Sequence, residues 1–301
     1  QYLGTKNNEL TNPYYGDAEG LGRIFKNMST FFSFTSNQIL SWKKSFGVHN
    51  LDAFVAHEST FYKSSDNYGQ KSKIVRPNNT EWSNAVIMDY MDSQTYGFDM
   101  ESYFGQIRYD YNDKYFFHGT LRRDGSSRFA EGHRWGTFPS VSAGWMISEE
   151  PWFNKSVIDY LKLRGSIGQL GNERIGSEFP YQAKLTFGTG FIPNASTGMA
   201  DVVQTAYQTD YAFNNLTWET TTTYGIGADI TLLNNRLKAS ADYYYKKTVD
   251  MLMEVGFPSY FGYNAPQNNA ADMNTKGWDL ELSWSDQIND FRYGVNFNLS
   301  D

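Results

Sequence analysis

Few residue types in this chain could support catalysis. Cysteine is absent, so thiol chemistry and disulfide bonds are excluded. The adjacent carboxylates Glu149 and Glu150 precede a proline, where a solvated turn is favoured over acid–base catalysis. No nucleophile, phosphate-loop or dinucleotide motif occurs. The histidines stand apart, without the short spacing typical of metal ligands; they are His49, His57, His118 and His133. We therefore expect neither an enzyme nor a metal or cofactor site.

Charged side chains of both signs gather at the end of a predicted strand. They are Arg122, Arg123, Asp124 and Arg128. One interpretation is a polar contact with a ligand or with a neighbouring domain. The other is a set of salt bridges that holds the rim of the molecule together. We favour the salt bridges, because charges of mixed sign usually pair among themselves.

Aromatic side chains also occur in three long segments, residues 65–94, 171–216 and 252–273, that we expect to be loops. Aromatic faces beside Asn and Gln are what sugars and peptides stack on and form hydrogen bonds with. The alternative is that these rings pack the loops against one another or against a partner protein. The candidates for ligand binding are Trp82, Tyr181, Tyr207, Tyr211, Tyr260 and Tyr263.

Between these segments, large apolar residues fall on every second position. Residues 278–284 read Trp-Asp-Leu-Glu-Leu-Ser-Trp, and residues 291–299 follow the same pattern. This is the period of a β-strand with one apolar and one polar face. In residues 217–233 the pattern predicts Ile226 and Ile230 on a lipid-facing side and Asp229 on a lumen-facing side.

Ten such strand-like segments can be counted, at residues 30–46, 49–64, 95–111, 114–126, 136–147, 160–170, 217–233, 236–251, 274–285 and 291–300. We expect short joins at 47–48, 112–113, 148–159, 234–235 and 286–290. Long joins are expected at 65–94, 127–135, 171–216 and 252–273. Short turns that alternate with long loops are typical of a transmembrane β-barrel, with the turns in the periplasm and the loops outside.

Composition is compatible with this interpretation. The net charge of −7 and the pI of about 5.2 argue against nucleic acid as the main partner. Aromatic residues make up 17% of the chain, although its mean hydropathy is only −0.58. A barrel has a low average hydropathy because half of each strand is polar. No run of the sequence approaches the roughly 20 apolar residues that a spanning helix needs.

Several stretches follow one another between residues 95 and 301. They are 121–129 (LRRDGSSRF), 135–145 (WGTFPSVSAGW), 161–172 (LKLRGSIGQLGN), 216–219 (LTWE), 234–237 (NNRL), 242–248 (DYYYKKT) and 274–278 (NTKGW). Together they resemble the barrel region of the SusC/RagA family of TonB-dependent outer-membrane transporters. Trp278 departs slightly from the family, in which that position is commonly aliphatic.

The resemblance implies an all-β fold, an antiparallel membrane-spanning barrel of about 22 strands with an N-terminal plug domain inside it. We expect residues 1–301 to be part of that barrel domain, with the plug and the final strands outside this chain. The charged cluster would then stand at the rim, facing the plug. The implied function is TonB-dependent import of an oligosaccharide or peptide across the Gram-negative outer membrane. The implied partners are a SusD-like surface lipoprotein, the TonB complex acting through the plug, outer-membrane lipid and the ligand.

Two other function classes stay open at this point. A passive porin would share the strand pattern and the asymmetry of the loops, but it would have no plug. A soluble carbohydrate-binding or glycosidase β-domain would pack one set of alternate residues into a core and would dissolve without detergent. The alternation of the joins and the stretch 121–129 both argue against the soluble domain.

Overall fold

The computed structural model describes residues 2–12, 22–76, 79–176, 179–193, 200–256, 258–264 and 267–301. The described strands are β1 (Tyr2–Asn12), β2 (Arg23–Phe46), β3 (His49–Ile74), β4 (Ala85–Tyr111), β5 (Tyr115–Ser126), β6 (Trp135–Met146), β7 (Ile158–Asn172), β8 (Leu185–Pro193), β9 (Ala200–Gln208), β10 (Glu219–Leu232), β11 (Leu237–Glu254), β12 (Gln267–Ile288) and β13 (Phe291–Ser300). Three short 3₁₀ helices accompany them, η1 (Trp82–Asn84), η2 (Ile147–Glu149) and η3 (Ser259–Phe261).

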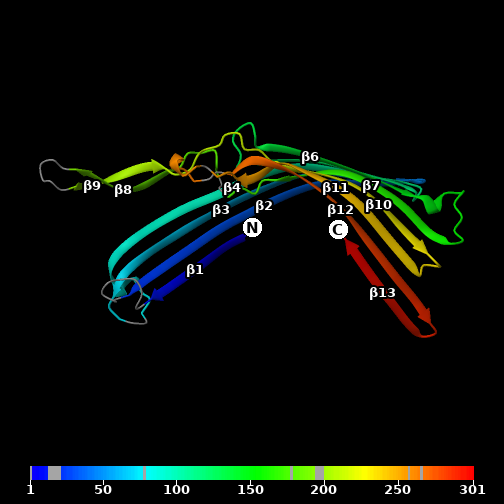
Figure 1. Ribbon diagram of the computed structural model, residues 1–301, viewed down its shortest axis with the longest axis horizontal. Helices are drawn as coiled ribbons and strands as arrows, with labels where there is room; N and C mark the ends of the chain where they lie inside the picture. The colour runs from blue at the N-terminus through cyan, green and yellow to red at the C-terminus, as the bar shows by residue number, and fades with distance from the viewer. Residues whose placement is uncertain are drawn as a thin grey trace. The chain divides into compact units, whose positions relative to one another are not determined.

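The strands form one sheet in the order β1-β2-β3-β4-β5-β6-β7-β10-β11-β12-β13, and β8 pairs with β9 in a separate two-stranded sheet. The paired strands run antiparallel to each other. Figure 1 shows this for β10, β11, β12 and β13, which follow one another in the sheet. This confirms the predicted antiparallel all-β fold and all ten predicted segments. Within the described ranges, no helix is both long and apolar enough to cross a bilayer.

The strands are longer than the sequence pattern indicated. Residues 65–94 were expected to form a loop, but β3 continues to Ile74 and β4 begins at Ala85, so the join is residues 75–84. The predicted loop 171–216 contains the β8–β9 hairpin, and the predicted loop 252–273 shortens to residues 255–266. In β3, Ser65, Asp66 and Asn67 interrupt the two-residue period on which the prediction depended.

The alternation of short and long joins is also less strict than predicted. The join between β6 and β7, residues 147–157, is longer than the join between β5 and β6, residues 127–134. The other joins keep the expected order. The tight turns use left-handed backbone, with φ of 54° at Asn112, 55° at Asn234 and 65° at Asn235. Asparagine tolerates this conformation better than most other non-glycine residues, which explains why asparagine occurs in these turns between paired strands.

The chain forms two compact units. Unit 1 comprises residues 1–37 and 58–101, and unit 2 comprises residues 38–57 and 102–301. Unit 1 therefore holds β1, the adjoining parts of β2, β3 and β4, and η1. Unit 2 holds the remaining parts of those three strands and all strands from β5 onward.

In unit 2 the registers sort the side chains into two faces. Across β6, β7, β10 and β11, Val141 pairs with Ile167, Ile167 with Tyr224, and Tyr224 with Tyr245. One step along, Leu163 pairs with Ala228 and Ala241 with Leu280. We call this side of the sheet the apolar face. Its large side chains are exposed, Ile226 by 66% and Ile167 by 44%, so the predicted lipid-facing residues share one uncovered surface.

A small buried cluster closes one end of unit 2. Phe129, Leu216 and Trp218 are at most 5% exposed, and Phe138 is 6% exposed. The Trp218 ring lies 5.3 Å from Phe129 and 5.4 Å from Phe138, measured between centroids. We call these four residues the rim core. Their burial explains why the stretch 121–129 ends in phenylalanine.

Candidate functional site

The face opposite the apolar face carries paired charges, and we call it the polar face. Arg164 of β7 donates from Nε to Asp229 of β10 at 2.8 Å and from Nη2 to Asp242 of β11 at 2.8 Å. Ser240 of β11 is held in the same network, 3.1 Å from Nη2 and 2.8 Å from Asp229. Asp229 was predicted to face a lumen, and the registers place Arg164, Ser240 and Asp242 on the same side of the sheet.

A glycine makes the long reach of Arg164 possible. Gly227 stands between Arg164 and Asp242 in the register of β7, β10 and β11. A Cβ at this position would collide with the Asp242 carboxylate and would lie 3.1 Å from the guanidinium carbon of Arg164. The absence of a side chain on β10 therefore lets one cation join carboxylates from two strands.

The charged residues of the cluster at 122–128 do not all lie together: three stand on β5, and Arg128 follows the end of that strand. Arg122 lies 2.8 Å from the Asp124 carboxylate, and its Nη2 donates to Ser102 at 3.1 Å. Arg128 pairs with Glu173 at 3.1 Å, beside the rim core. These three predicted residues thus form two ion pairs that tie β4, β5 and the segment after β7 together at the rim.

Arg123 does not join this network. It alternates with Arg122 along β5, so its side chain lies on the same side as Leu121 and points away from Arg122 and Asp124. Its guanidinium carbon lies 5.3 Å from the centroid of the Trp135 ring on β6. The single cluster predicted from the sequence is therefore wrong for Arg123, because neighbouring residues of a strand face opposite ways.

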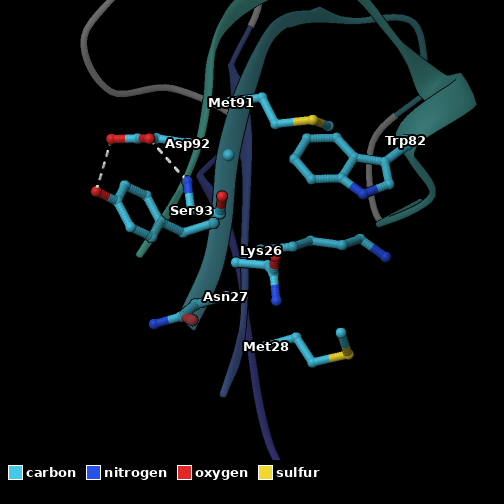
Figure 2. Close-up of a pocket in the computed structure, with 10 residues that line it drawn as sticks. Lys26, Asn27, Met28, Trp82, Met91, Asp92 and Ser93 are labelled. Carbon is cyan, nitrogen blue, oxygen red and sulfur yellow. Dashed lines mark hydrogen bonds between the residues drawn. The ribbon is translucent and has the colours of Figure 1, made fainter. Parts of the chain in front are cut away.

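In unit 1, Trp82 lines a groove of about 600 Å³ across β2, β3 and β4, which we call the Trp82 groove. Figure 2 shows the side chains of Trp82, Met91, Lys26 and Met28 directed to one side of the strands, with Asp92 directed to the other. The remaining lining residues are Asn27, Asn67, Tyr68, Gly69 and Ser93.

The Trp82 groove has an apolar wall whose position is fixed by neighbouring residues. A Cβ on Gly69 would lie 3.4 Å from the tip of the Trp82 ring, so glycine allows the indole to lie over the strand. Lys71 Nζ donates to the Trp82 carbonyl at 2.9 Å, which holds η1 against β3. On the opposite side of the strands from Trp82, the Tyr68 hydroxyl donates to Asp92 at 3.1 Å (Figure 2). An exposed aromatic face of this kind suits a sugar ring or a peptide side chain.

In unit 2, three joins meet at a second pocket of about 290 Å³, which we call the loop pocket. Asn264 Nδ2 donates to Asp210 at 2.9 Å, and the Asn264 amide donates to the Thr209 carbonyl at 2.9 Å. Further along, the Phe213 amide donates to the Pro180 carbonyl at 3.1 Å. The segments after β7, after β9 and after β11 are therefore joined into one surface.

Two of the predicted aromatic residues meet at this surface. The Tyr211 and Tyr263 rings are 5.8 Å apart and nearly perpendicular, and Phe213 lies 5.0 Å from Tyr211. Tyr211 stays 47% exposed, so one part of its ring is open to a ligand. Lys184 and Glu254 add charges of both signs to the lining.

The other predicted aromatics lie outside both hollows. Tyr181 packs against Phe179 and donates to the Ser127 carbonyl at 3.3 Å, so it supports the rim. Tyr207 stands on β9 and is 52% exposed. Tyr260 lies on η3 with 84% of its surface exposed, and the Phe261 ring lies 5.1 Å from its own, measured between centroids.

Sequence reasoning missed the partners of Trp82. Tyr68, Met91 and Asp92 were assigned to a loop, whereas they belong to β3 and β4. The apolar run Ala85 to Met91 is typical of a strand and could have identified β4 earlier. Within the described residues, no group of three or more His, Asp or Glu side chains is arranged to hold a metal ion.

The whole chain, residues 1–301, matches the family described as TonB dependent receptor-like, beta-barrel. SusC of Bacteroides thetaiotaomicron, a TonB-dependent receptor, is 31% identical over 278 residues, which is 89% of this chain and 26% of SusC. A TonB-dependent receptor of Formosa agariphila is 36% identical over 217 residues, 71% of this chain and 20% of that protein.

Solved structures show the same fold. The chain resembles the structure of the RagAB peptide transporter with a TM-score of 0.81 and 22% identity, over 99% of this chain and 34% of that one. The chain spans between a fifth and about a quarter of the length of the curated relatives. The apolar face is accordingly the lipid-facing side of a barrel wall, and the chain belongs to the TonB-dependent receptor β-barrel family of the Gram-negative outer membrane.

Proposed function

We propose that the full-length protein to which this chain belongs imports an oligosaccharide or a peptide, powered by TonB. The observation that carries this proposal is the loop pocket at the end of the strands opposite the tight turns. β7 ends there, β10 begins there, and β11 joins β12 there, whereas the turns 147–157 and 233–236 lie at the other end. Since the tight turns of such barrels face the periplasm, this pocket faces the outside.

In this proposal the chain supplies part of the barrel domain, and a plug elsewhere in the same polypeptide closes the barrel. The Arg122–Asp124 pair at the rim would face that plug. The likeness to SusC supports a sugar ligand, and the likeness to the RagAB peptide transporter supports a peptide. The aromatic, amide and charged groups of the loop pocket suit either one. The chain itself carries wall and loops, and we assign it no catalytic residue.

The import proposal is tested by uptake in cells that express the full-length protein. Labelled oligosaccharides and peptides are supplied separately, with and without a protonophore that removes the energy for TonB. Energy-dependent uptake of one class supports the proposal. Uptake that continues unchanged without energy would instead identify a passive porin.

Tyr211→Ala should weaken apparent ligand affinity by about tenfold, which corresponds to loss of one aromatic contact worth about 1.4 kcal/mol. Trp82→Ala tests the Trp82 groove in the same assay. Trp152→Ala is the matched control, because Trp152 is 67% exposed on the β6–β7 join at the opposite end of the strands. Equal uptake by all variants would remove both hollows as ligand sites.

We further propose that a SusD-like surface lipoprotein covers the loops, with the β8–β9 hairpin as one contact. Phe187, Phe191 and Val202 of this hairpin are 67%, 70% and 68% exposed, and apolar exposure of this extent marks interaction sites. Replacing residues 185–208 by a short glycine–serine turn should leave the barrel assembled and reduce co-purification of the lipoprotein. Unchanged co-purification would exclude the hairpin as the contact.

A further inference from the structure

A shallow groove of about 870 Å³ crosses the lipid-facing side of β2 to β6 in unit 2. Its floor is formed at Gly105 and Gly119, which have no side chains to fill it. Its walls are large apolar side chains that are all more than 40% exposed, namely Leu40, Trp42, Val55, Tyr103, Ile107 and Leu121. We call it the lipid-side groove, and its size and lining suit acyl chains.

The lipid-side groove has a cation at one end. Arg123 lines it, two residues beyond Leu121 on the same side of β5. The Trp135 ring supports the guanidinium from one side at 5.3 Å and itself lies against Gly125. In the described part of the chain, Arg123 forms no ion pair with a carboxylate. A charge on the lipid-facing side of a barrel is costly near the midplane and tolerated at the interface.

The aromatic side chains place Arg123 at the outer interface. Tyr115 and Trp145, stacked at 6.4 Å, lie next to the β4–β5 and β6–β7 turns and mark the periplasmic interface. Arg123 stands eight residues further along β5, which is about 26 Å along the strand and about 20 Å along the membrane normal at the usual tilt. Tyr103 and Trp135, 6.1 Å apart, form the matching pair at the outer level.

We propose that this groove binds an outer-leaflet lipid with a phosphate headgroup, whose acyl chains lie over Gly105 and Gly119 and whose phosphate pairs with Arg123. Arginine suits phosphate because its planar guanidinium can donate two parallel hydrogen bonds. Trp135 would leave one edge of the guanidinium open to the headgroup while it limits the motion of the side chain. A second hollow on the apolar face, lined by Val141, Ile167, Tyr224, Ile226 and Tyr243 among others, has no cation in its lining.

The test is native mass spectrometry of the full-length protein in detergent with added lipid A, compared with lipid A from which the phosphates have been removed. Wild type should retain the phosphorylated form preferentially. Arg123→Gln should lower its occupancy by about fivefold, as expected for one arginine at a lipid surface, and should remove the preference. Arg292→Gln is the control. It removes a cation beside the tight turn between β12 and β13, and it should not change the occupancy of either lipid form.

A second variant tests the acyl part of the site. A Cβ at Gly119 would only touch the Phe117 ring at 3.5 Å, so Gly119→Leu fits the strand and fills the groove. It should reduce binding of both lipid forms, whereas Ala228→Leu, on the apolar face of β10, should reduce neither. Heat-modifiable migration in electrophoresis checks that each variant has assembled. No phosphate preference in wild type, or equal binding by Arg123→Gln and Arg292→Gln, would overturn the proposal without bearing on import.

Discussion

Single polar residues fix the ends of the strands on the periplasmic side. Glu150, in the β6–β7 turn, accepts hydrogen bonds from the Tyr115 hydroxyl at 2.5 Å and from Trp145 Nε1 at 3.0 Å. These two donors, with Lys114 nearby at 3.8 Å, hold the pKa of the Glu150 carboxyl below its usual value. One carboxylate therefore connects both strands of the aromatic pair to the turn.

Because the pKa of Glu150 is lowered by folding, its ionised form stabilises the folded state. This contribution is present above the unfolded pKa of about 4.3 and is lost as the pH falls through the lower folded value. Glu150→Gln should therefore lower the melting temperature at pH 7, and the difference from wild type should shrink below about pH 4. Melting of the detergent-solubilised full-length protein across pH measures this.

Glu149→Gln is the control for that experiment. Glu149 pairs with Lys155 at 2.7 Å, and both side chains are 49% exposed, so its loss should change the melting temperature little at any pH. If Glu149→Gln and Glu150→Gln behave alike, the turn is not held in the way described.

On the polar face, Arg164 neutralises two carboxylates at once. Arg164→Gln should destabilise the barrel by about 1 kcal/mol, because Asp229 and Asp242 are left as like charges. The network is partly exposed to water, which keeps the effect small. Adding Asp242→Asn to Arg164→Gln should restore part of the loss in urea unfolding. An additive double variant would show that the three charges do not interact.

At the scale of elements, the rim core fixes how the joins leave the sheet. Trp218 Nε1 donates to the Arg134 carbonyl at 3.0 Å, and Arg134 Nε donates to the Phe129 carbonyl at 3.2 Å. The segment before β10 is thereby attached to the join between β5 and β6. This explains why the stretches 121–129, 135–145 and 216–219 occur together in the sequence.

Phe129→Ala should destabilise the protein by about 3–5 kcal/mol, because it removes a fully buried ring. Gly171→Val is an independent test, since any Cβ there would collide with the Phe138 ring. Phe187→Ala on the exposed hairpin is the control and should change stability by less than about 0.5 kcal/mol. Equal unfolding midpoints for Phe129→Ala and Phe187→Ala would contradict the existence of a rim core.

The strand pattern was predictable where apolar and polar residues alternate, and it was missed where that alternation is interrupted. In residues 217–251 apolar and polar side chains alternate strictly. The pattern therefore predicts the correct side of the sheet for Asp229, a partner of Arg164. In β3, Ser65, Asp66 and Asn67 break the alternation, so the extension of this strand was missed. The Arg123 assignment failed for another reason, since nearness in sequence was taken as nearness in space.

The candidate site was predictable only in part. Tyr211 and Tyr263 could be identified as aromatics in polar loops, but their meeting depends on the Asp210–Asn264 contact between joins that are far apart in sequence. Trp82 was identified without its groove, because the groove needs Gly69 and the paired strands beneath it. Pairings of this kind are set by register, which a single sequence indicates weakly.

At the scale of the whole molecule, the account depends on one division: the apolar face meets hydrocarbon, and the polar face meets water. The family, the registers and the exposed aliphatic side chains agree on this division. Import, the plug-facing rim and the lipid-side groove all presuppose it. A barrel wall whose alternate residues met the same solvent could perform none of these functions.

Spin labels on the full-length protein in lipid vesicles test this division most directly. Labels at Ile226, Ile230 and Leu280 should collide with dissolved oxygen, which concentrates in the bilayer. Labels at Thr223 of β10 and Ser240 of β11, both on the polar face, should collide with a water-soluble nickel complex. Labels at Ile226, Ile230 and Leu280 that are shielded from oxygen, or that meet the nickel complex as readily as Thr223 and Ser240 do, would contradict the account.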